Sequence, residues 1–258
     1  WSKRAIVRSI KGDRDGSLAD FTRVVELQPD LPNSWTNRGT ARSARNDLEG
    51  AIEDYTRAIE LDPEFVKAWS NRGATRFEKG DLEGALGDYN RALEIDREHA
   101  HTWNNRGNVW KAMHEWEKAV EDYTHALEIN PKMVQALNSR GFVFSMMGSW
   151  DKALADYTRW IDIQPKSVVA WVNRGILRSK MEDLDGAISD YTRAIEINAE
   201  YASAWGGRGT ARRKKGIIRD AITDWETFLD LAPNDPKAAY VRAELKRLRA
   251  QLEKQKEK

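Results

Sequence analysis

The sequence predicts an all-α protein built as a solenoid of antiparallel helix pairs. Three observations predict this class: a tryptophan recurs every 34 residues, a glycine follows it four residues later, and an aromatic residue follows it twenty residues later. Each unit also carries apolar residues at helical spacing, with a glycine or a proline where a helix should end. A recurrence of this length is typical of stacked helical hairpins.

The recurring residues define two helices in each unit. The first helix carries the large residue at Trp1, Trp35, Trp69, Trp103, Leu137, Trp171 and Trp205. It then carries a small residue at Ala5, Gly39, Gly73, Gly107, Gly141, Gly175 and Gly209. The second helix carries the aromatic residue at Phe21, Tyr55, Tyr89, Tyr123, Tyr157, Tyr191 and Trp225. We expect the small residues to let the two helices approach closely while the aromatic rings fill the gaps around them.

The composition excludes several classes of protein. With no cysteine, the chain has no disulfide framework, no thiolate metal site and no cysteine nucleophile. A net charge of +1 provides no global field to attract nucleic acid or an anionic membrane. No apolar run approaches the roughly 18 residues that a membrane span needs, and no signal peptide is evident. Because the chain opens on Trp1 rather than methionine, we expect a processed or excised piece of a protein. The sequence names no compartment, so a soluble, cytoplasmic protein is only the default expectation.

The pattern W-x-x-R-G followed by A-I-x-D-Y-x-x-A-I-x-L-x-P resembles the tetratricopeptide repeat. With the recurring tryptophan taken as position 4 of the repeat, seven units occupy residues 1–235, and the first is truncated at its N-terminus. The resemblance implies a right-handed superhelix whose first helices line a concave groove. It also implies a non-enzymatic scaffold or adaptor that binds an extended or short helical peptide of a partner protein.

Residues 236–258 depart from the repeat. Asp235 and Pro236 provide a helix start, and the residues after them form an apolar stripe of Val241, Leu245, Leu248 and Leu252. We expect a capping helix with a polar tail, because a solenoid must cover the apolar face of its last repeat. A coiled-coil dimer seam is the alternative, although the stripe spans fewer than two heptads.

The resemblance implies that positions 2, 5, 6, 9, 12 and 13 of each first helix face the groove. Position 6 carries Asn37, Asn71, Asn105, Ser139 and Asn173 in the second to sixth units. An asparagine amide both donates and accepts hydrogen bonds, so a row of them can hold the backbone of an extended peptide. The alternative is that these amides bond to a neighbouring helix and fix the geometry of the repeats.

Apolar residues interrupt the polar groove positions. Phe77, Asn108, Phe142 and Met146 occupy positions 12, 9, 9 and 13, and Trp110 lies near the expected groove edge. An apolar pocket flanked by asparagines would suit a short amphipathic or extended ligand, whereas packing between adjacent repeats is the alternative. Some tetratricopeptide repeat proteins hold the C-terminal carboxylate of chaperones, but the lysine and arginine of that clamp are missing from positions 5 and 6 here.

An arginine at position 7 and an aspartate at position 23 recur in all seven units. We expect each arginine to pair with the aspartate of its own unit and to join the two helices, with two parallel hydrogen bonds where geometry permits. A second arginine follows four residues later in five units, at Arg8, Arg42, Arg76, Arg178 and Arg212. The rival interpretation is a phosphate-binding strip, which is disfavoured because every position-7 arginine has its own aspartate.

The sequence gives no sign of catalysis. No phosphate-binding loop, catalytic triad or metal-spaced histidine cluster is present, so we expect no enzyme activity, no cofactor and no metal. Besides the peptide scaffold, two alternatives stay open: a self-associating module that assembles a homo-oligomer, and the regulatory region of a larger protein. Binding of RNA or DNA is the least favoured interpretation.

Overall fold

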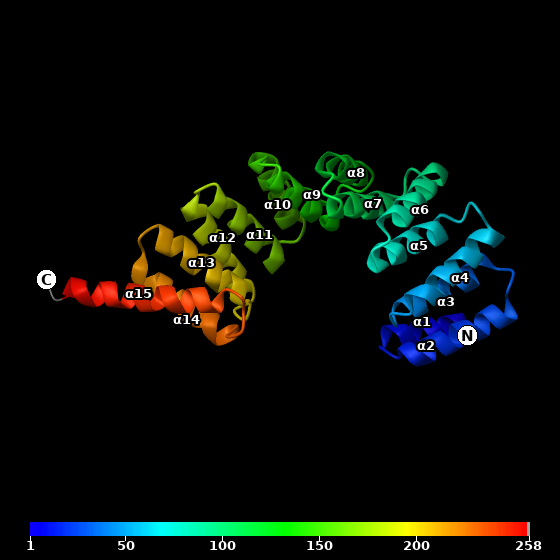
Figure 1. Ribbon diagram of the computed structural model, residues 1–258, viewed down its shortest axis with the longest axis horizontal. Helices are drawn as coiled ribbons and strands as arrows, with labels where there is room; N and C mark the ends of the chain where they lie inside the picture. The colour runs from blue at the N-terminus through cyan, green and yellow to red at the C-terminus, as the bar shows by residue number, and fades with distance from the viewer. Residues whose placement is uncertain (257–258) are drawn as a thin grey trace. The chain divides into compact units, whose positions relative to one another are not determined.

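The computed structural model describes residues 1–256, and all the regular structure in that range is α-helical (Figure 1). The first helices of the units are α1 (Ser2–Ile10), α3 (Pro32–Ser43), α5 (Val66–Lys79), α7 (Ala100–Ala112), α9 (Val134–Met146), α11 (Val168–Lys180) and α13 (Ala202–Lys214). The second helices are α2 (Arg14–Leu27), α4 (Leu48–Leu61), α6 (Leu82–Ile95), α8 (Trp116–Ile129), α10 (Trp150–Ile163), α12 (Leu184–Ile197) and α14 (Ile218–Leu231). The last helix is α15 (Ala238–Lys256), and the predicted all-α solenoid of helix pairs is confirmed.

The helices gather into two larger groups, which we call the first compact unit (Trp1–Ala136) and the second compact unit (Leu137–Lys258). In the first unit each helix pair packs on the next, through α2 with α3, α4 with α5, and α6 with α7. In the second unit the same stacking joins α10 with α11, α12 with α13, and α14 with α15. Some first helices also touch one another: α3 contacts α5, α5 contacts α7, and α11 contacts α13.

The glycine at position 8 permits close contact within the six helix pairs that carry it, from the second repeat to the seventh. A Cβ atom added to Gly39 would lie only 2.8 Å from Cε1 of Tyr55, and one added to Gly73 would lie 2.9 Å from Cε1 of Tyr89. Real Cβ atoms do not approach so closely, and the tyrosine rings are buried. The expectation that small residues admit the aromatic rings is therefore confirmed.

Helix ends follow the local sequence. Gly80 ends α5 with a φ of +88°, a left-handed conformation that glycine adopts without strain. The carboxylate of Asp81 then accepts a hydrogen bond from the backbone amide of Gly84 at 2.9 Å, which caps the start of α6. The same cap recurs at Asp13, Asp47 and Asp183.

The last helix covers the apolar face of the seventh pair. Val241, Leu245 and Leu248 of α15 are buried against Trp225 and Phe228 of α14. The apolar stripe that could have formed a dimer seam is thus used inside the chain. This packing favours the capping interpretation, while the division into seven repeats over residues 1–235 stays an interpretation of the pattern.

Candidate functional site

All seven expected arginine–aspartate pairs are formed. In the third unit, Nε and Nη2 of Arg72 donate to Oδ2 and Oδ1 of Asp88 at 3.0 and 2.7 Å, across the helix pair. The same bidentate geometry joins Arg4–Asp20, Arg38–Asp54, Arg106–Asp122, Arg140–Asp156, Arg174–Asp190 and Arg208–Asp224. These guanidinium groups are engaged inside the fold, which removes the main support for a nucleic-acid strip.

The same arginine also connects one repeat to the preceding one. Nη1 of Arg72 donates to Oγ1 of Thr56 at 2.9 Å, and its guanidinium carbon lies 4.8 Å from the ring centroid of Trp69. The indole N–H of Trp69 in turn donates to the carbonyl of Pro63 at 2.9 Å. Trp35, Trp103, Trp171 and Trp205 repeat this stacking and this bond to the preceding turn. The recurring tryptophan is therefore a joint between repeats.

The second arginine is absent from the fourth and fifth units, where Trp110 and Phe144 stand in its place. In the third unit that arginine, Arg76, reaches Oδ2 of Asp88 at 2.9 Å. Among the described residues, Asp122 of the fourth repeat forms an ion pair with Arg106 alone, and burial raises the pKa of its carboxyl above the usual value despite that pair.

Two expected groove residues contribute to packing. Phe77 and Trp110 are half-buried and pack against the core cluster that contains Leu86, Tyr89 and Val109. Lys118 adds its ammonium group 4.6 Å from the Trp110 ring centroid. These contacts favour the packing alternative for both aromatic residues.

The asparagines differ in how far their amides are engaged. Asn173 donates to Oδ1 of Asn138 at 2.9 Å, and Asn108 accepts the hydroxyl of Tyr123 at 2.8 Å. Asn71 and Asn105 have only long contacts: Asn71 donates to Thr40 at 3.5 Å, and Asn105 accepts from Asn104 at 3.4 Å. Asn37 is half-exposed, and its side chain has no hydrogen bond among residues 1–256. The amides of Asn37, Asn71 and Asn105 therefore have hydrogen-bonding capacity left for a ligand.

The expected apolar residues of α9 are exposed. Phe142 and Met146 are 46% and 53% exposed, one helical turn apart, and Ser139 of the same helix is half-buried. Large apolar side chains at this exposure gain free energy when a partner covers them.

A pocket of about 480 Å³ lies within the second compact unit, between α11, α13 and the start of α15. Helix α11 lines it with Val172, Asn173, Ile176, Ser179 and Lys180, at positions 5, 6, 9, 12 and 13. Helix α13 lines it with Ser203, Gly206, Gly207, Thr210 and Lys214, at positions 2, 5, 6, 9 and 13, together with Ala211. The positions that the resemblance assigns to the groove thus converge on one concavity, and Asn173 lies in its wall.

Sequence reasoning missed several residues of this pocket. Ile176 is 45% exposed and occupies the same repeat position as Phe142, a signal that the mixed polar and apolar composition of position 9 obscured. Gly207 departs from the asparagine pattern, and a departure toward glycine leaves space where the other repeats carry a side chain. Tyr240 and Lys237 lie beyond the repeats, where no repeat position predicts their role.

Tyr191 forms part of the inner wall of the pocket. Burial raises the pKa of its phenol to about 12, so the hydroxyl stays protonated at neutral pH. A Cβ atom added to Gly207 would lie 2.6 Å from Cε1 and Cζ of this ring. Gly207 is therefore required for the ring to lie where it does.

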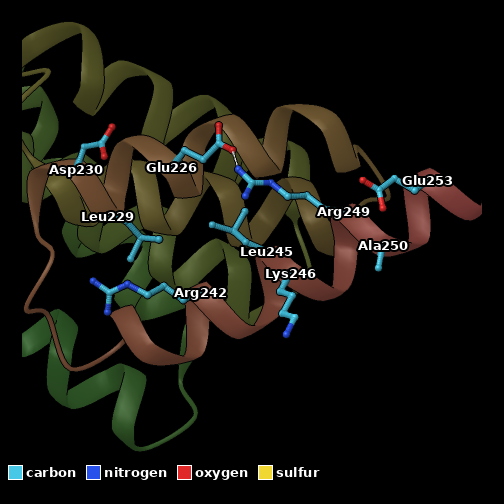
Figure 2. A pocket seen from close by; sticks show the side chains of 9 residues that line it. All are labelled: Glu226, Leu229, Asp230, Arg242, Leu245, Lys246, Arg249, Ala250 and Glu253. Atoms are coloured by element: carbon cyan, nitrogen blue, oxygen red, sulfur yellow. Dashed lines mark hydrogen bonds and ion pairs between the residues drawn. The ribbon is translucent and has the colours of Figure 1, made fainter.

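A second hollow, of about 600 Å³, lies between α14 and α15 (Figure 2). Leu229 and Leu245 point into the space between the two helices, and the carboxylate of Glu226 is ion-paired with Arg249. Three acidic and three basic side chains line this hollow, so it carries no net charge to select a ligand.

Two classes of site are not found in the described part of the chain. Over residues 1–256, no group of three or more histidine, aspartate or glutamate side chains is arranged to hold a metal ion. None of the helices in that range combines the length and the apolar character that crossing a bilayer requires.

Comparison with known proteins agrees with the repeat pattern. A family described as "TPR repeat" matches residues 41–80, and families described as "Tetratricopeptide repeat" match residues 66–99, 100–133 and 168–201. A search of curated proteins finds no match.

Several solved structures share the fold. The structure of YrrB, described as a TPR protein with an unusual peptide-binding site, is 22% identical, with a TM-score of 0.63, and covers 74% of this chain and 99% of its own. A tetratricopeptide repeat protein from Parabacteroides merdae is 22% identical, with a TM-score of 0.65 and coverage of 95% and 96%. The C-terminal part of a TPR repeat-containing protein from Cytophaga hutchinsonii is 14% identical, with a TM-score of 0.72 and coverage of 93% and 99%.

Likeness at these identities shows the fold, and the matched families show what kind of repeat forms it. The 34-residue period and the helix pairs agree with that match. The chain belongs to the tetratricopeptide repeat family.

Proposed function

We propose that this protein is a scaffold that binds a peptide segment of a partner protein along the exposed sides of its first helices. The tetratricopeptide repeat is in general a protein-interaction fold and is typically non-catalytic. The finer proposal concerns where the peptide binds, namely at positions 2, 5, 6, 9, 12 and 13 of the first helices.

The observation that carries this proposal is the pocket between α11, α13 and α15 in the second compact unit. Ten of its lining residues come from those six positions of α11 and α13. The resemblance assigned these positions to a groove, and in α11 and α13 they line the same concavity, which supports the assignment. YrrB, whose description names a peptide-binding site, shares the fold and lends further support.

The first compact unit offers a second candidate surface for the peptide, on α5 and α7. Asn71 and Asn105 have spare hydrogen-bonding capacity, and Lys111 stands at position 12 of α7. Burial lowers the pKa of Lys111, and its ammonium group has no carboxylate partner among residues 1–256. Spare amides and an unpaired ammonium group on the neighbouring helices α5 and α7 suit a peptide backbone that ends in, or carries, a carboxylate.

Selection of peptides from a random library tests the proposal directly. Phage that display random dodecapeptides are selected on the immobilised full chain, and enriched peptides are then synthesised with a fluorescent label. Binding is measured by fluorescence anisotropy for the wild type and for an Asn71→Ala/Asn105→Ala double variant. We expect enrichment of peptides, and a weaker affinity for at least one enriched class in the double variant.

The control is a substitution on a second helix. Arg193 of α12 is exposed, and within the described part of the chain it pairs only with Glu196 one turn away, so Arg193→Ala should leave binding unchanged. Enrichment of no peptide, or loss of binding in Arg193→Ala but in no first-helix variant, would refute the groove proposal.

Self-association is a second candidate because α1 exposes an apolar side. Trp1, Ile6 and Val7 are about half exposed, and Ile10 is 81% exposed. A second copy that covered these side chains would remove their apolar surface from water. Light scattering over a concentration series should then show a mass above that of the monomer, and a monomer at every concentration would exclude this candidate.

A further inference from the structure

Part of the wall of the pocket in the second compact unit is apolar. Ile176 of α11 and Tyr240 of α15 both line it, although they are 45% and 55% exposed. Val172 and Phe228 lie deeper in the same lining and are buried. Exposed apolar groups that meet in one hollow retain surface that a ligand can cover, and the volume lies in the range of small-ligand pockets.

Helix α13 contributes to the hollow by omitting two side chains. Gly206 and Gly207 occupy positions 5 and 6, where the other first helices carry larger residues such as Val172 and Asn173. A glycine in a helix interior is less favourable than an alanine. Contact with Tyr191 accounts for Gly207, whereas a Cβ atom on Gly206 would meet the Phe228 ring at 3.1 Å, so a small movement of that ring would admit it. The bare backbone at Gly206 is therefore less dictated by packing and lets a ligand approach α13 closely.

The charge around the pocket is positive. Lys180, Lys214 and Lys237 line it against a single acidic residue, Asp235. Lys214 is paired with Glu182 at 2.8 Å, and the carboxylate of Asp235 accepts the backbone amide of Lys237 at 2.8 Å. The ammonium groups of Lys180 and Lys237 have no carboxylate partner among the described residues, so both can receive one from a ligand.

We infer that this pocket binds a bulky apolar side chain of the partner segment, flanked within that segment by one or more carboxylates. The inference rests on the proposed peptide-binding function and specifies its ligand. The apolar side chain covers Ile176 and Tyr240, and the carboxylates meet Lys180 and Lys237 at the rim. A basic segment would meet like charge at the same rim, and a uniformly polar segment would leave the apolar walls in water.

The same library selection tests this inference through the sequences that it enriches. We expect peptides in which phenylalanine, tryptophan, leucine or isoleucine stands within two residues of aspartate or glutamate. In a synthetic peptide of that class, replacing the bulky residue by alanine should weaken binding about tenfold or more, because burial of such a side chain is worth about 1.5–3 kcal/mol. Raising the salt concentration should also weaken binding, through the rim lysines.

Variants of the protein locate the binding site. Thr210→Trp fills the pocket from an exposed position on α13 and should abolish binding of these peptides. Its matched control is Thr223→Trp on α14, since Thr223 is also exposed and its hydroxyl also donates to the carbonyl four residues earlier. Ile176→Ser and Tyr240→Ser change exposed side chains and should each weaken binding about tenfold, while Lys180→Glu/Lys237→Glu should reverse the preference for acidic peptides.

The outcomes separate this inference from the proposed function. If enriched peptides are basic, or if their affinity depends on Asn71 and Asn105 but is the same in Thr210→Trp and in Thr223→Trp, the inference is wrong and the groove proposal stands. If no peptide is enriched, both are wrong. Loss of binding in Thr210→Trp with retention in Thr223→Trp, for acidic–apolar peptides, would support the inference.

Discussion

Neutralising the aspartate of an arginine–aspartate pair should cost more in the third unit than in the fourth. Asp88 is 2% exposed and receives three hydrogen bonds or ion contacts, two from Arg72 and one from Arg76. Asp88→Asn would leave two guanidinium groups without the carboxylate between them. Removal of one partner from a buried pair costs about 3–5 kcal/mol, so we expect a loss of that size.

Asp122 differs because the second arginine is absent. Asp122→Asn strands only Arg106, whose Nη1 keeps a bond to Oδ1 of Asn90 at 2.8 Å. Burial already raises the pKa of Asp122, which means that part of the pair's attraction offsets the cost of burying its charge. We therefore expect a smaller loss, of about 1.5–3 kcal/mol, the range for hydrogen bonds to charged groups.

Amide hydrogen exchange followed helix by helix is the suitable assay. Repeat arrays can unfold in parts, so a single denaturation midpoint would average over the repeats. Protection should fall in α5 and α6 for Asp88→Asn and, by less, in α7 and α8 for Asp122→Asn. Arg57→Ala, which breaks an exposed pair with Glu60, is the control and should cost less than about 1 kcal/mol. Equal losses at Asp88 and Asp122, or a larger loss at Asp122, would refute the reasoning.

Three further predictions concern stability. Gly73→Ala should destabilise the chain by about 1–3 kcal/mol, since the new Cβ would lie 2.9 Å from Tyr89. Gly87→Ala in α6 meets no atom within 4 Å and should stabilise the chain by about 0.5–1 kcal/mol. Urea denaturation compares the two variants, and a Gly73→Ala variant as stable as the wild type would contradict the packing argument. Burial lowers the pKa of His99 in the folded chain below its value in the unfolded chain, so its contribution to the free energy of unfolding should be present at pH 7 and be lost as the pH drops below about 6.5. Thermal denaturation at several pH values should show a weaker dependence of the melting temperature on pH in His99→Asn, and an identical dependence would rule His99 out as the cause. Leu245→Ala should cost about 2–5 kcal/mol and loosen α14, detected as faster amide exchange there; unchanged exchange would show that α15 does not cap the last repeat.

The repeat period was sufficient to predict the helix pairs and the contacts inside them. A residue that recurs seven times in the same place has one structural explanation, and the arginine–aspartate pairs were predictable because both partners recur with the same offset. The close contact of Gly39 with Tyr55 follows from the same logic.

The candidate site was predicted less well, because binding depends on departures from the period. The pocket combines Ile176 from the variable position 9, Gly206, which departs from the larger residues at its position, and Tyr240, which lies outside the repeats. Phe77 and Trp110 also differ from the residues at the same positions of most other repeats, but they pack against the core of the first compact unit. A departure from a repeat pattern marks a position of interest, and only the three-dimensional neighbours decide whether it faces a ligand or a neighbouring helix.

The joint between repeats has a consequence for the length of the molecule. In the third repeat the indole of Trp69 donates to the Pro63 carbonyl and the guanidinium of Arg72 donates to the Thr56 hydroxyl, and the sixth and seventh repeats use the equivalent atoms. If residues 66–99 were excised, Trp103 and Arg106 would meet the same carbonyl and the same hydroxyl, because they occupy equivalent positions. Whole repeats can therefore be removed or duplicated without any new interface having to be invented, so such a chain can change its reach in steps of 34 residues.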